Sequence, residues 1–427
     1  MAGKHLQSCS SVHGEVELLG DKSISHRALM FSAISNDVCR VTGLSPARDV
    51  KSTMECLKQL GVSIDQEKNA TLVQGVGQFG LIPPSEPLDC GNSGTTLRLL
   101  TGILAAQEFT STLTGDASLN KRPMRRIIEP LELMGAEIDS ADYKAPLVIK
   151  GRPLRAIDYA SPIASAQVKS AILLAGLFAK GVTRVTEPYQ SRDHSERLLE
   201  YMGASVQTTQ AMAGIKGPFE LQAREINIPK DVSAAAFFLV AGALLENSEL
   251  ILKNVGINTT RTGIFDVLSS MEAQYEIADE ALVNNEPRAQ ITIKSSSLQS
   301  TTLSGPIIPR VIDEIPIIAV AATQAHGTTI IKDARELRVK ESDRIAAIVN
   351  NLKRMKADVR EKQDGFVIKG PTPLKGANIN SYGDHRIAMA FSIAALIAEG
   401  ETVIDDIECI NISFPGFYES LEDIIEN

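Results

Sequence analysis

Cationic side chains gather at the start of several apolar segments of the sequence. Lys22 and Arg27 flank Ser23 in the segment GDKSISHR, and Arg98 follows the glycine turn GNSG, residues 91–94. A helix N-terminus presents free N–H groups and the positive end of a dipole, so it suits anions. Two nearby glycines also let backbone N–H groups approach a phosphate closely. These segments predict anion binding, although an ordinary glycine turn opening a core helix explains GNSG equally well by itself.

Asp313 and Glu341 are the candidate acid and base. Asp313 precedes an apolar segment in DEIP, and Glu341 lies among cations in RVKESDR. A carboxylate within hydrogen-bond reach can take a proton from a hydroxyl, and a carboxylic acid can supply one. The structural alternatives are capping of a helix by Asp313 and a solvated helix start at RVKESDR. Sequence alone does not set the distance between the two carboxylates.

Two further clusters add arginines to this set. Pro123 disfavours a helix just before it, so we predict that Arg122 lies in an extended or loop segment. Arg386 opens an apolar segment in YGDHRIAM. Arginine can bind carboxylate and phosphate groups through two hydrogen bonds at once. For His194 and His385, which lie beside such clusters, we expect structural hydrogen bonds to neighbouring acids.

The clusters contrast with the charge of the whole chain. Its 427 residues include 43 Lys+Arg and 52 Asp+Glu, a net charge of −9. This acidity argues against non-specific nucleic-acid binding and against docking on anionic membranes. The cations therefore predict focused positive potential for small substrates that carry several negative charges.

The cysteines and the apolar stretches indicate the cellular compartment in which the protein works. The five cysteines are scattered and form no CxxC or Cys/His cluster, so neither a disulfide framework nor a zinc site is supported. The N-terminal segment has no apolar signal region. The longest apolar stretch, residues 232–245, is too short to span a bilayer. We expect a protein of the reducing cytoplasm.

The elements that must position these residues recur along the chain. Alanine-rich apolar segments with polar starts begin at Gly20, Asp89, Ser165, Asp231, Asp313 and Asp384. Between them lie amphipathic helices followed by alternating strands, with Gly61, Gly135 and Gly203 placed as left-handed helix ends. Each unit of about 70 residues reads as βαββαβ. Segments apolar nearly all round belong inside, so we predict helices inside and sheets outside. Ordinary α/β alternation with chance similarity is the alternative.

The motifs together resemble one family in order and from end to end. GDKSISHR, GNSGTTLR, RPM, SAQVKSA, RDHSER, DEIP, RVKESDR, YGDHRIAM and SFPGF are similar to the 5-enolpyruvylshikimate-3-phosphate synthases. The resemblance implies a monomeric, two-domain inside-out α/β barrel of six βαββαβ repeats, three per domain. The N-terminal domain would span residues 20–228, and the C-terminal domain residues 1–19 plus 229–427. Hinge crossovers would lie near residues 19–20 and 228–229.

The resemblance also implies a reaction. The enolpyruvyl group of phosphoenolpyruvate is transferred to the 5-hydroxyl of shikimate 3-phosphate, and phosphate is released, by addition and then elimination. This transferase step belongs to the shikimate pathway of chorismate and aromatic amino-acid biosynthesis. The two metabolites are the expected partners, and no cofactor, metal, nucleic acid or membrane is expected.

Site roles follow from the same resemblance, motif by motif. Asp313 would accept the hydroxyl proton, Glu341 would supply and recover the proton at the methylene carbon, and Lys22 would touch both substrates. The residues implied for shikimate 3-phosphate are Lys22, Ser23, Arg27, Ser165, Ala166, Gln167, Arg192, Asp313 and Lys340. Those implied for phosphoenolpyruvate are Lys22, Gly94, Arg122, Gln167, Arg344 and Arg386.

The sequence departs from the family pattern at two positions. Ile412 stands where some relatives carry a lysine of the phosphoenolpyruvate site, and Glu336 stands where some carry asparagine. Gly94 keeps the small residue whose replacement by alanine is associated with tolerance of the herbicide glyphosate. We therefore expect glyphosate to compete with phosphoenolpyruvate in this protein.

Three other functions are alternatives. The enolpyruvyl transferase that acts on UDP-N-acetylglucosamine in cell-wall synthesis shares the repeats. However, it usually has a cysteine ahead of its RP motif, and residues 113–123 contain none. A non-catalytic binding protein on the same scaffold would not need both Asp313 and Glu341. An RNA-end-processing enzyme of similar topology is disfavoured by the net charge of −9.

Overall fold

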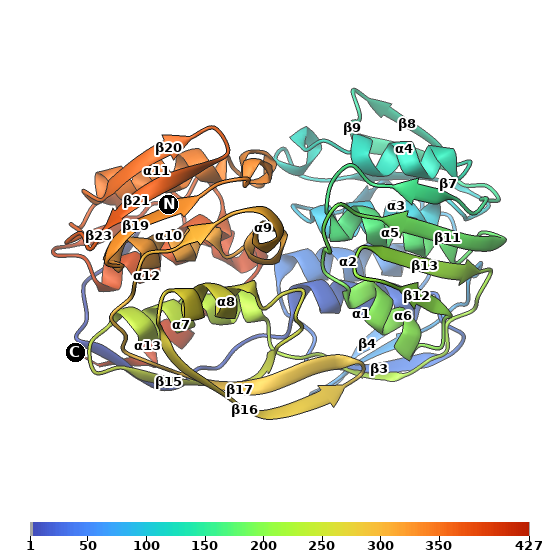
Figure 1. Ribbon diagram of the computed structural model, residues 1–427. Coiled ribbons are helices and arrows are strands. Elements are labelled where there is room, and N and C mark those ends of the chain that lie inside the picture. Colours follow the sequence, from blue (N-terminus) through green and yellow to red (C-terminus); the bar gives the residue numbers. More distant parts are fainter. Residues whose placement is uncertain (1–2, 427) are drawn as a thin grey trace. The chain divides into compact units, whose positions relative to one another are not determined.

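The computed structural model describes residues 3–426 of the chain. These residues form two compact units (Figure 1). Unit 1 comprises described residues 3–19, 229–281 and 287–426, and unit 2 comprises Gly20–Ile228 and Leu282–Glu286. The short segment Leu282–Glu286 therefore clusters with unit 2, whereas the sequence analysis assigned it to the C-terminal domain.

Unit 2 contains six α-helices and twelve strands within the described residues. The helices are α1 (Lys22–Ala33), α2 (Arg48–Gln59), α3 (Gly94–Leu104), α4 (Arg125–Leu133), α5 (Ala166–Gly176) and α6 (His194–Tyr201). A 3₁₀ turn, η1 (Leu119–Lys121), precedes α4. The strands are β3 (Val38–Thr42), β4 (Ile64–Gln66), β5 (Thr71–Gln74), β6 (Leu88–Asp89), β7 (Thr110–Thr114), β8 (Glu137–Ala141), β9 (Lys144–Lys150), β10 (Asp158–Ala160), β11 (Gly181–Thr186), β12 (Val206–Thr208), β13 (Met212–Gly217) and β14 (Glu225–Asn227).

Unit 1 is built from the same kinds of element. Its helices are α7 (Val232–Leu244), α8 (Gly263–Ser270), α9 (Ile308–Val311), α10 (Ile315–Gln324), α11 (Arg344–Arg354), α12 (His385–Leu396) and α13 (Phe417–Glu422), with 3₁₀ turns η2 (Gly305–Ile307), η3 (Arg335–Val339) and η4 (Glu408–Ile412). Its strands are β1 (Lys4–Leu6), β2 (Ser11–Glu15), β15 (Glu249–Gly256), β16 (Gln274–Val283), β17 (Glu286–Lys294), β18 (Thr302–Leu303), β19 (Gly327–Ile331), β20 (Asp358–Lys362), β21 (Gly365–Gly370), β22 (Asn378–Ile379), β23 (Thr402–Ile404) and β24 (Ile425–Glu426).

Four of the sheets repeat one pairing pattern. The orders β14–β3–β5–β4, β6–β7–β9–β8, β10–β11–β13–β12 and β18–β19–β21–β20 each hold a parallel pair followed by two antiparallel pairs. A helix connects the two parallel strands in three of these sheets, as parallel pairing requires. The other sheets have the orders β16–β17–β15–β2–β24 and β1–β23–β22.

The order of elements within a repeat differs from the predicted one. The chain runs β6–α3–β7–α4–β8–β9, which is βαβαββ, and not βαββαβ. The alternating segment after each amphipathic helix proves to be a hairpin of two strands, and not one strand. Between β8 and β9 the turn residues Asp142 and Tyr143 both have a φ of 52°, as a tight hairpin turn requires.

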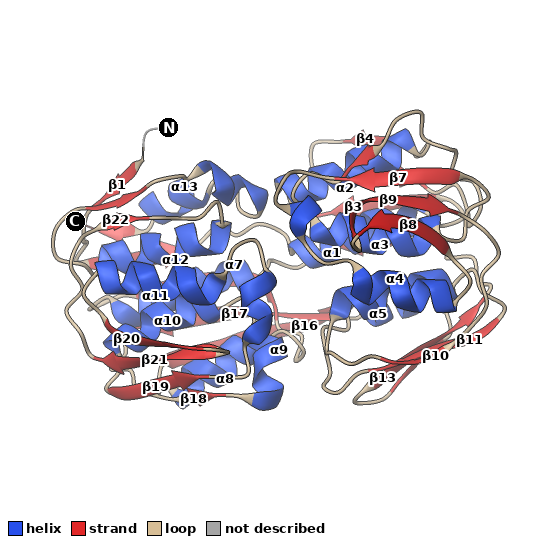
Figure 2. Ribbon diagram, turned by 90° about the horizontal axis from the view of Figure 1, so that it is seen from above, coloured by secondary structure: helices blue, strands red, loops and turns tan. Residues whose placement is uncertain are grey.

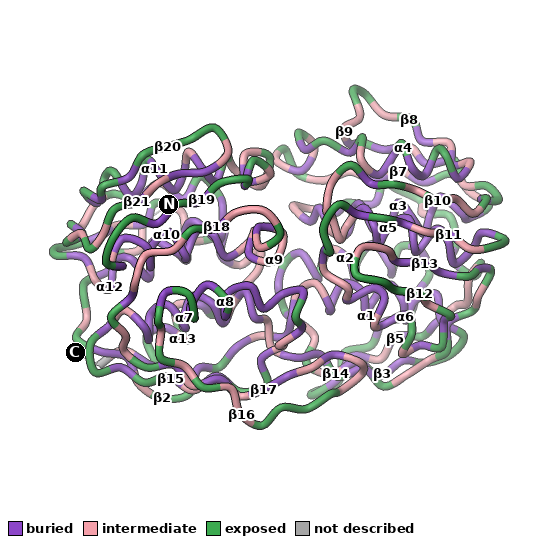
Figure 3. The backbone as a smooth tube through the Cα atoms, in the orientation of Figure 1, coloured by how far each residue is buried: buried purple, intermediate pink, exposed green. Residues whose placement is uncertain are grey.

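The alanine-rich helices lie inside each unit, as predicted. In α12 every residue is buried, and α1, α3, α5, α7 and α10 are buried along nearly their whole length. Figure 2 shows the strands outside these helices, and Figure 3 shows the same helices as buried. The inside-out arrangement follows from their composition, because a helix that is apolar all round has no face suited to water.

Strands distant in sequence complete the first sheet of each unit. In unit 2, β14 pairs in parallel with β3, with Ile226 opposite Val41. In unit 1, β2 pairs in parallel with β15, with Leu250 opposite Gly14. The N-terminal strands therefore belong to the sheets of unit 1.

Within residues 3–426, none of the helices has both the length and the apolar character that crossing a membrane would take.

Prediction: Gly102→Ala lowers stability. Gly102 lies where α3 packs against α5, and a Cβ there would lie 2.3 Å from the backbone oxygen of Ala171. Because backbone cannot move aside cheaply, we expect the free energy of unfolding to fall by about 1–3 kcal/mol, measured by urea denaturation. Gly256→Ala is the control, because its Cβ would find its nearest neighbour at 3.5 Å. Equal effects of the two substitutions would contradict the prediction.

Candidate active site

Arg344 is the centre of a charged cluster in unit 1. It is the first residue of α11 and follows Asp343, whose Oδ1 caps the helix by accepting from the N–H of Ala346 at 3.0 Å. Arg344 Nε lies 2.8 Å from Asp384 Oδ2, and its Nη2 lies 2.7 Å from Glu341 Oε2. Its Nη1 lies 3.3 Å from Asp313 Oδ1. One guanidinium therefore holds three carboxylates from three segments of the chain.

The charge of Arg344 is fixed by these partners. Its side chain is only 1% exposed. Burial opposes the charge, but Asp384, Glu341 and Asp313 outweigh burial and raise the pKa of Arg344. A buried charge is tolerated when it is paired and hydrogen-bonded in this way.

Asp313 faces three cations. In addition to Arg344, its Oδ1 lies 3.7 Å from Lys340 Nζ, and its Oδ2 lies 3.8 Å from Arg386 Nη2. Arg386 also donates from Nη1 to the backbone oxygen of Asp313 at 3.0 Å. Helix α10 begins after Glu314, without a side-chain cap. The capping role considered for Asp313 is therefore not observed, and its carboxylate belongs to the charged cluster.

Arg27 is the buried cation of the first repeat in unit 2. Its Nε and Nη2 each donate at 2.8 Å, to the hydroxyls of Ser195 and Ser170, and Nη1 donates to the backbone oxygen of Ser23 at 2.9 Å. These bonds join α1, α5 and α6. They also fix the backbone beside Lys22, the first residue of α1.

Lys22 is paired with an acid that sequence reasoning missed. Its Nζ lies 2.8 Å from Asp49 Oδ2, and both side chains are largely buried. The backbone oxygen of Asp49 accepts from the hydroxyl of Thr96 in α3 at 3.4 Å. The starts of α1 and α3 are thereby linked through Asp49, whose distance from Lys22 in sequence gave no local signal.

Gln167, Gly94 and Arg122 meet around Arg98. Arg98 Nη1 donates to Gln167 Oε1 at 2.6 Å, while Gln167 Nε2 donates to the hydroxyl of Thr95 at 2.9 Å. A Cβ on Gly94 would lie 2.5 Å from Arg98 Nη1 and 3.4 Å from Arg122 Nη1. Two arginines therefore lie against the start of α3, and any side chain at position 94 would require the Arg98 guanidinium to move.

Arg122 is held in the predicted extended conformation. Its φ and ψ are −72° and 142°, and its Nη2 donates to Asn92 Oδ1 at 2.7 Å. Pro123 accounts for the backbone, as the sequence indicated. Asn92 belongs to the glycine turn, so the arginine of LNKRPMRR and the GNSG segment come together.

The remaining predicted residues lie on two neighbouring loops of unit 2. Ser165 and Ala166 stand at the start of α5, and Arg192 lies in the loop before α6. Both loops contact Glu187, which accepts from the N–H of Ser165 at 2.7 Å and from the hydroxyl of Ser191 at 2.8 Å. His194 makes a structural hydrogen bond, but its partner is the distant Glu286, at 2.6 Å.

One of the two departures from the family pattern is Ile412. Ile412 ends η4 and packs against the apolar core of unit 1, so no cation stands there.

Among residues 3–426, no group of three or more His, Cys, Asp or Glu side chains is arranged to hold a metal ion.

The chain was compared with known proteins. The family model described as EPSP synthase (3-phosphoshikimate 1-carboxyvinyltransferase) matches residues 6–421. A 3-phosphoshikimate 1-carboxyvinyltransferase of Citrifermentans bemidjiense is 49% identical over 423 residues, 99% of each chain. One of Bacillus thuringiensis is 51% identical over 415 residues, 97% of each chain. The solved EPSP synthase of Acinetobacter baumannii superposes with a TM-score of 0.88 at 42% identity, covering 99% of this chain and 98% of the other. The resemblance seen in the motifs is confirmed, and the chain belongs to the EPSP synthase (3-phosphoshikimate 1-carboxyvinyltransferase) family.

Proposed function

We propose that the protein transfers the enolpyruvyl group of phosphoenolpyruvate to the 5-hydroxyl of shikimate 3-phosphate and releases phosphate. The family membership supports this activity. The observation that carries it is the cluster of Asp313 and Glu341 around Arg344. Two carboxylates held by one cation offer both the base and the acid that an addition–elimination reaction needs.

Unit 2 binds shikimate 3-phosphate in this proposal. Arg27 with Ser23, and the α5 start formed by Ser165, Ala166 and Gln167, supply positive charge and hydrogen-bond donors, and Arg192 adds a cation. Helix starts and arginines together suit a phosphate group. Lys22 and Gln167 contact both substrates.

Phosphoenolpyruvate binds through arginines in this proposal. Gly94 leaves space beside Arg122, and Arg344 and Arg386 add two further guanidinium groups. A phosphate and a carboxylate on one small molecule each suit a bidentate arginine contact. Anionic groups of phosphoenolpyruvate compete with Glu341 for Arg344, which frees Glu341 to carry a proton.

The chemical steps use the carboxylates of unit 1. Asp313 accepts the proton of the 5-hydroxyl, and Lys340, 3.7 Å from Asp313, stays beside the oxygen that loses it. Glu341 donates a proton to the methylene carbon, so positive charge develops on the adjacent carbon, where the 5-oxygen bonds. Carboxylates stabilise that charge electrostatically. Glu341 then recovers a methyl proton as the carbon–phosphate oxygen bond breaks, and phosphate leaves with the proton that Asp313 accepted.

We also propose where the enzyme acts, in what oligomeric state and with which partners. It acts in the cytoplasm as a monomer, without a cofactor or metal, and contributes to aromatic amino-acid biosynthesis. Its partners are the two small-molecule substrates.

Prediction: Asp313→Asn and Glu341→Gln each lower turnover by at least about 100-fold, because each removes a proton-transfer group. The measurement is phosphate release with both substrates present, each being omitted in turn. Asp343→Asn is the matched control. It lies in the same segment, pairs with Arg338 and caps α11, and asparagine caps helices well. Near-wild-type turnover in either test variant would remove the role assigned to that residue.

Prediction: glyphosate competes with phosphoenolpyruvate for its site, and Gly94→Ala weakens the binding of glyphosate and of phosphoenolpyruvate. The added methyl would displace the Arg98 guanidinium, 2.5 Å away, and with it the contact to Gln167. We expect the inhibition constant of glyphosate and the KM for phosphoenolpyruvate each to rise by about tenfold, as the loss of a charged hydrogen bond predicts. Steady-state kinetics at varied phosphoenolpyruvate concentration measures both. Inhibition of the wild type only at millimolar glyphosate would refute the competition.

A further inference from the structure

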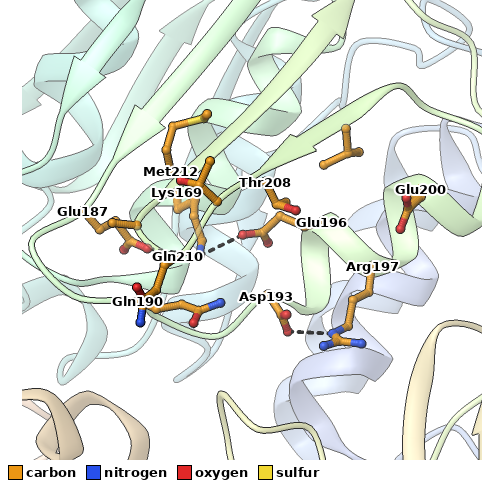
Figure 4. Close-up of a pocket in the computed structure, with 13 residues that line it drawn as sticks. Lys169, Glu187, Gln190, Asp193, Glu196, Arg197, Glu200, Thr208, Gln210 and Met212 are labelled. Carbon is orange, nitrogen blue, oxygen red and sulfur yellow. Dashed lines mark hydrogen bonds and ion pairs between the residues drawn. The ribbon is translucent and has the colours of Figure 1, made fainter.

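A buried lysine lies in the first turn of the apolar helix α5. Lys169 Nζ is 3.0 Å from Glu187 Oε2 and 2.8 Å from Glu196 Oε1. It also donates to the backbone oxygen of Ser191 at 3.3 Å. Figure 4 shows its side chain directed between the two carboxylates. None of these three charged residues was assigned a role by the sequence motifs.

The three charges are almost completely removed from water. The side chains of Lys169, Glu187 and Glu196 are 4%, 3% and 5% exposed. Burial alone would lower the pKa of Lys169, but Glu196 and Glu187 outweigh burial and raise it. Burying such charges is costly unless geometry and hydrogen bonds compensate. An apolar side chain would fit α5 at lower cost, so the lysine calls for another explanation.

Glu187 connects this lysine to two loops. Its Oε1 accepts from the N–H of Ser165 at 2.7 Å, and its Oε2 accepts from the Ser191 hydroxyl at 2.8 Å and from the Ser191 N–H at 3.3 Å. Lys169 holds the second loop as well, through the Ser191 oxygen. One buried ion pair thus fixes the start of α5 and the residue just before Arg192.

Glu196 differs from Glu187 in what it holds. It contacts Lys169 from α6 through Oε1, while its Oε2 is buried and has no hydrogen-bond partner within the described part of the chain. Burial raises its pKa, although Lys169 opposes that rise. It helps to line a pocket of about 360 Å³, together with Asp193, Arg197 and Glu200. Among the hydrogen bonds of the described residues, those to the Ser165 and Ser191 loops come from Glu187 and not from Glu196, so the two carboxylates form a matched pair for experiment.

We propose that Lys169 and Glu187 are positioning residues for shikimate 3-phosphate, because their buried pair sets the geometry of the Ser165 and Ser191–Arg192 loops that bind its phosphate. The inference rests on the function proposed above. Neither residue touches the substrate. Their effect passes through the backbone N–H of Ser165 and the backbone and hydroxyl of Ser191. Fixing these groups before the substrate arrives reduces the ordering cost of binding.

The test replaces each glutamate by glutamine. In Glu187→Gln, the amide oxygen can still accept from Ser165, but the amide NH₂ then faces the Lys169 ammonium and the Ser191 backbone N–H, which can only donate. We expect the KM for shikimate 3-phosphate to rise by about tenfold or more, as the loss of charge-assisted hydrogen bonds predicts. The turnover number and the KM for phosphoenolpyruvate should stay within about twofold of wild type.

Glu196→Gln is the control, because it removes the same charge from the same lysine at similar burial. It should lower the melting temperature about as much as Glu187→Gln, yet leave the KM for shikimate 3-phosphate within about twofold. A purely structural role for the ion pair would move the KM values of both variants together. Equal KM changes in the two variants, or none in Glu187→Gln, would overturn the proposal.

Ser191→Ala tests the positioning role if the Glu187→Gln variant does not fold. It removes only one small hydroxyl and its 2.8 Å bond to Glu187. Calorimetric titration with shikimate 3-phosphate should show an affinity about threefold weaker, the low end for one hydrogen bond. An unchanged affinity would overturn the positioning role alone. A wild-type protein that binds no shikimate 3-phosphate would overturn the proposed function, and the positioning role with it.

Discussion

A guanidinium that is 1% exposed persists in unit 1 because three carboxylates surround it. Taking that charge from water is costly, and only close, hydrogen-bonded partners repay the cost. The constraint also works in reverse, because Asp313, Glu341 and Asp384 come from separate segments and repel one another. Arg344 permits them to approach. The two carboxylates proposed for catalysis are therefore positioned by the same interaction that makes the buried charge tolerable.

Unit 2 also contains buried cations that are stabilised by close hydrogen-bonded partners. Arg27 is held by two serine hydroxyls and a backbone oxygen, and Lys169 is held by two glutamates. Each of these cations lies on a helix that is buried along most of its length in the core of the unit. Alanine-rich helices allow close packing, and a few cations give them polar anchoring points. The repeat thus combines a dense core with charged groups whose side chains have little freedom to move.

Local chemistry could be predicted from sequence, and long-range pairing could not. Pro123 dictated the extended backbone of Arg122, and Gly61 has the left-handed φ of 90° that its place after a helix indicated. The inside position of the helices followed from composition. By contrast, the Lys22–Asp49 and Arg344–Asp384 ion pairs join residues far apart in sequence. The spacing of such residues along the chain does not predict that they meet in the fold. The hairpins were misread because two short alternating strands joined by a tight turn have the periodicity of one.

The pairing of β2 with β15 and β24 has a consequence for synthesis on the ribosome. β1 and β2 precede unit 2 in the chain, yet their partner strands are translated more than two hundred residues later. Meanwhile the first sheet of unit 2 can close as soon as β14 reaches β3. The nascent chain must therefore carry β1 and β2 unpaired while unit 2 is synthesised, so edges open to wrong pairing persist until β15 emerges to pair with β2 and β23 emerges to pair with β1.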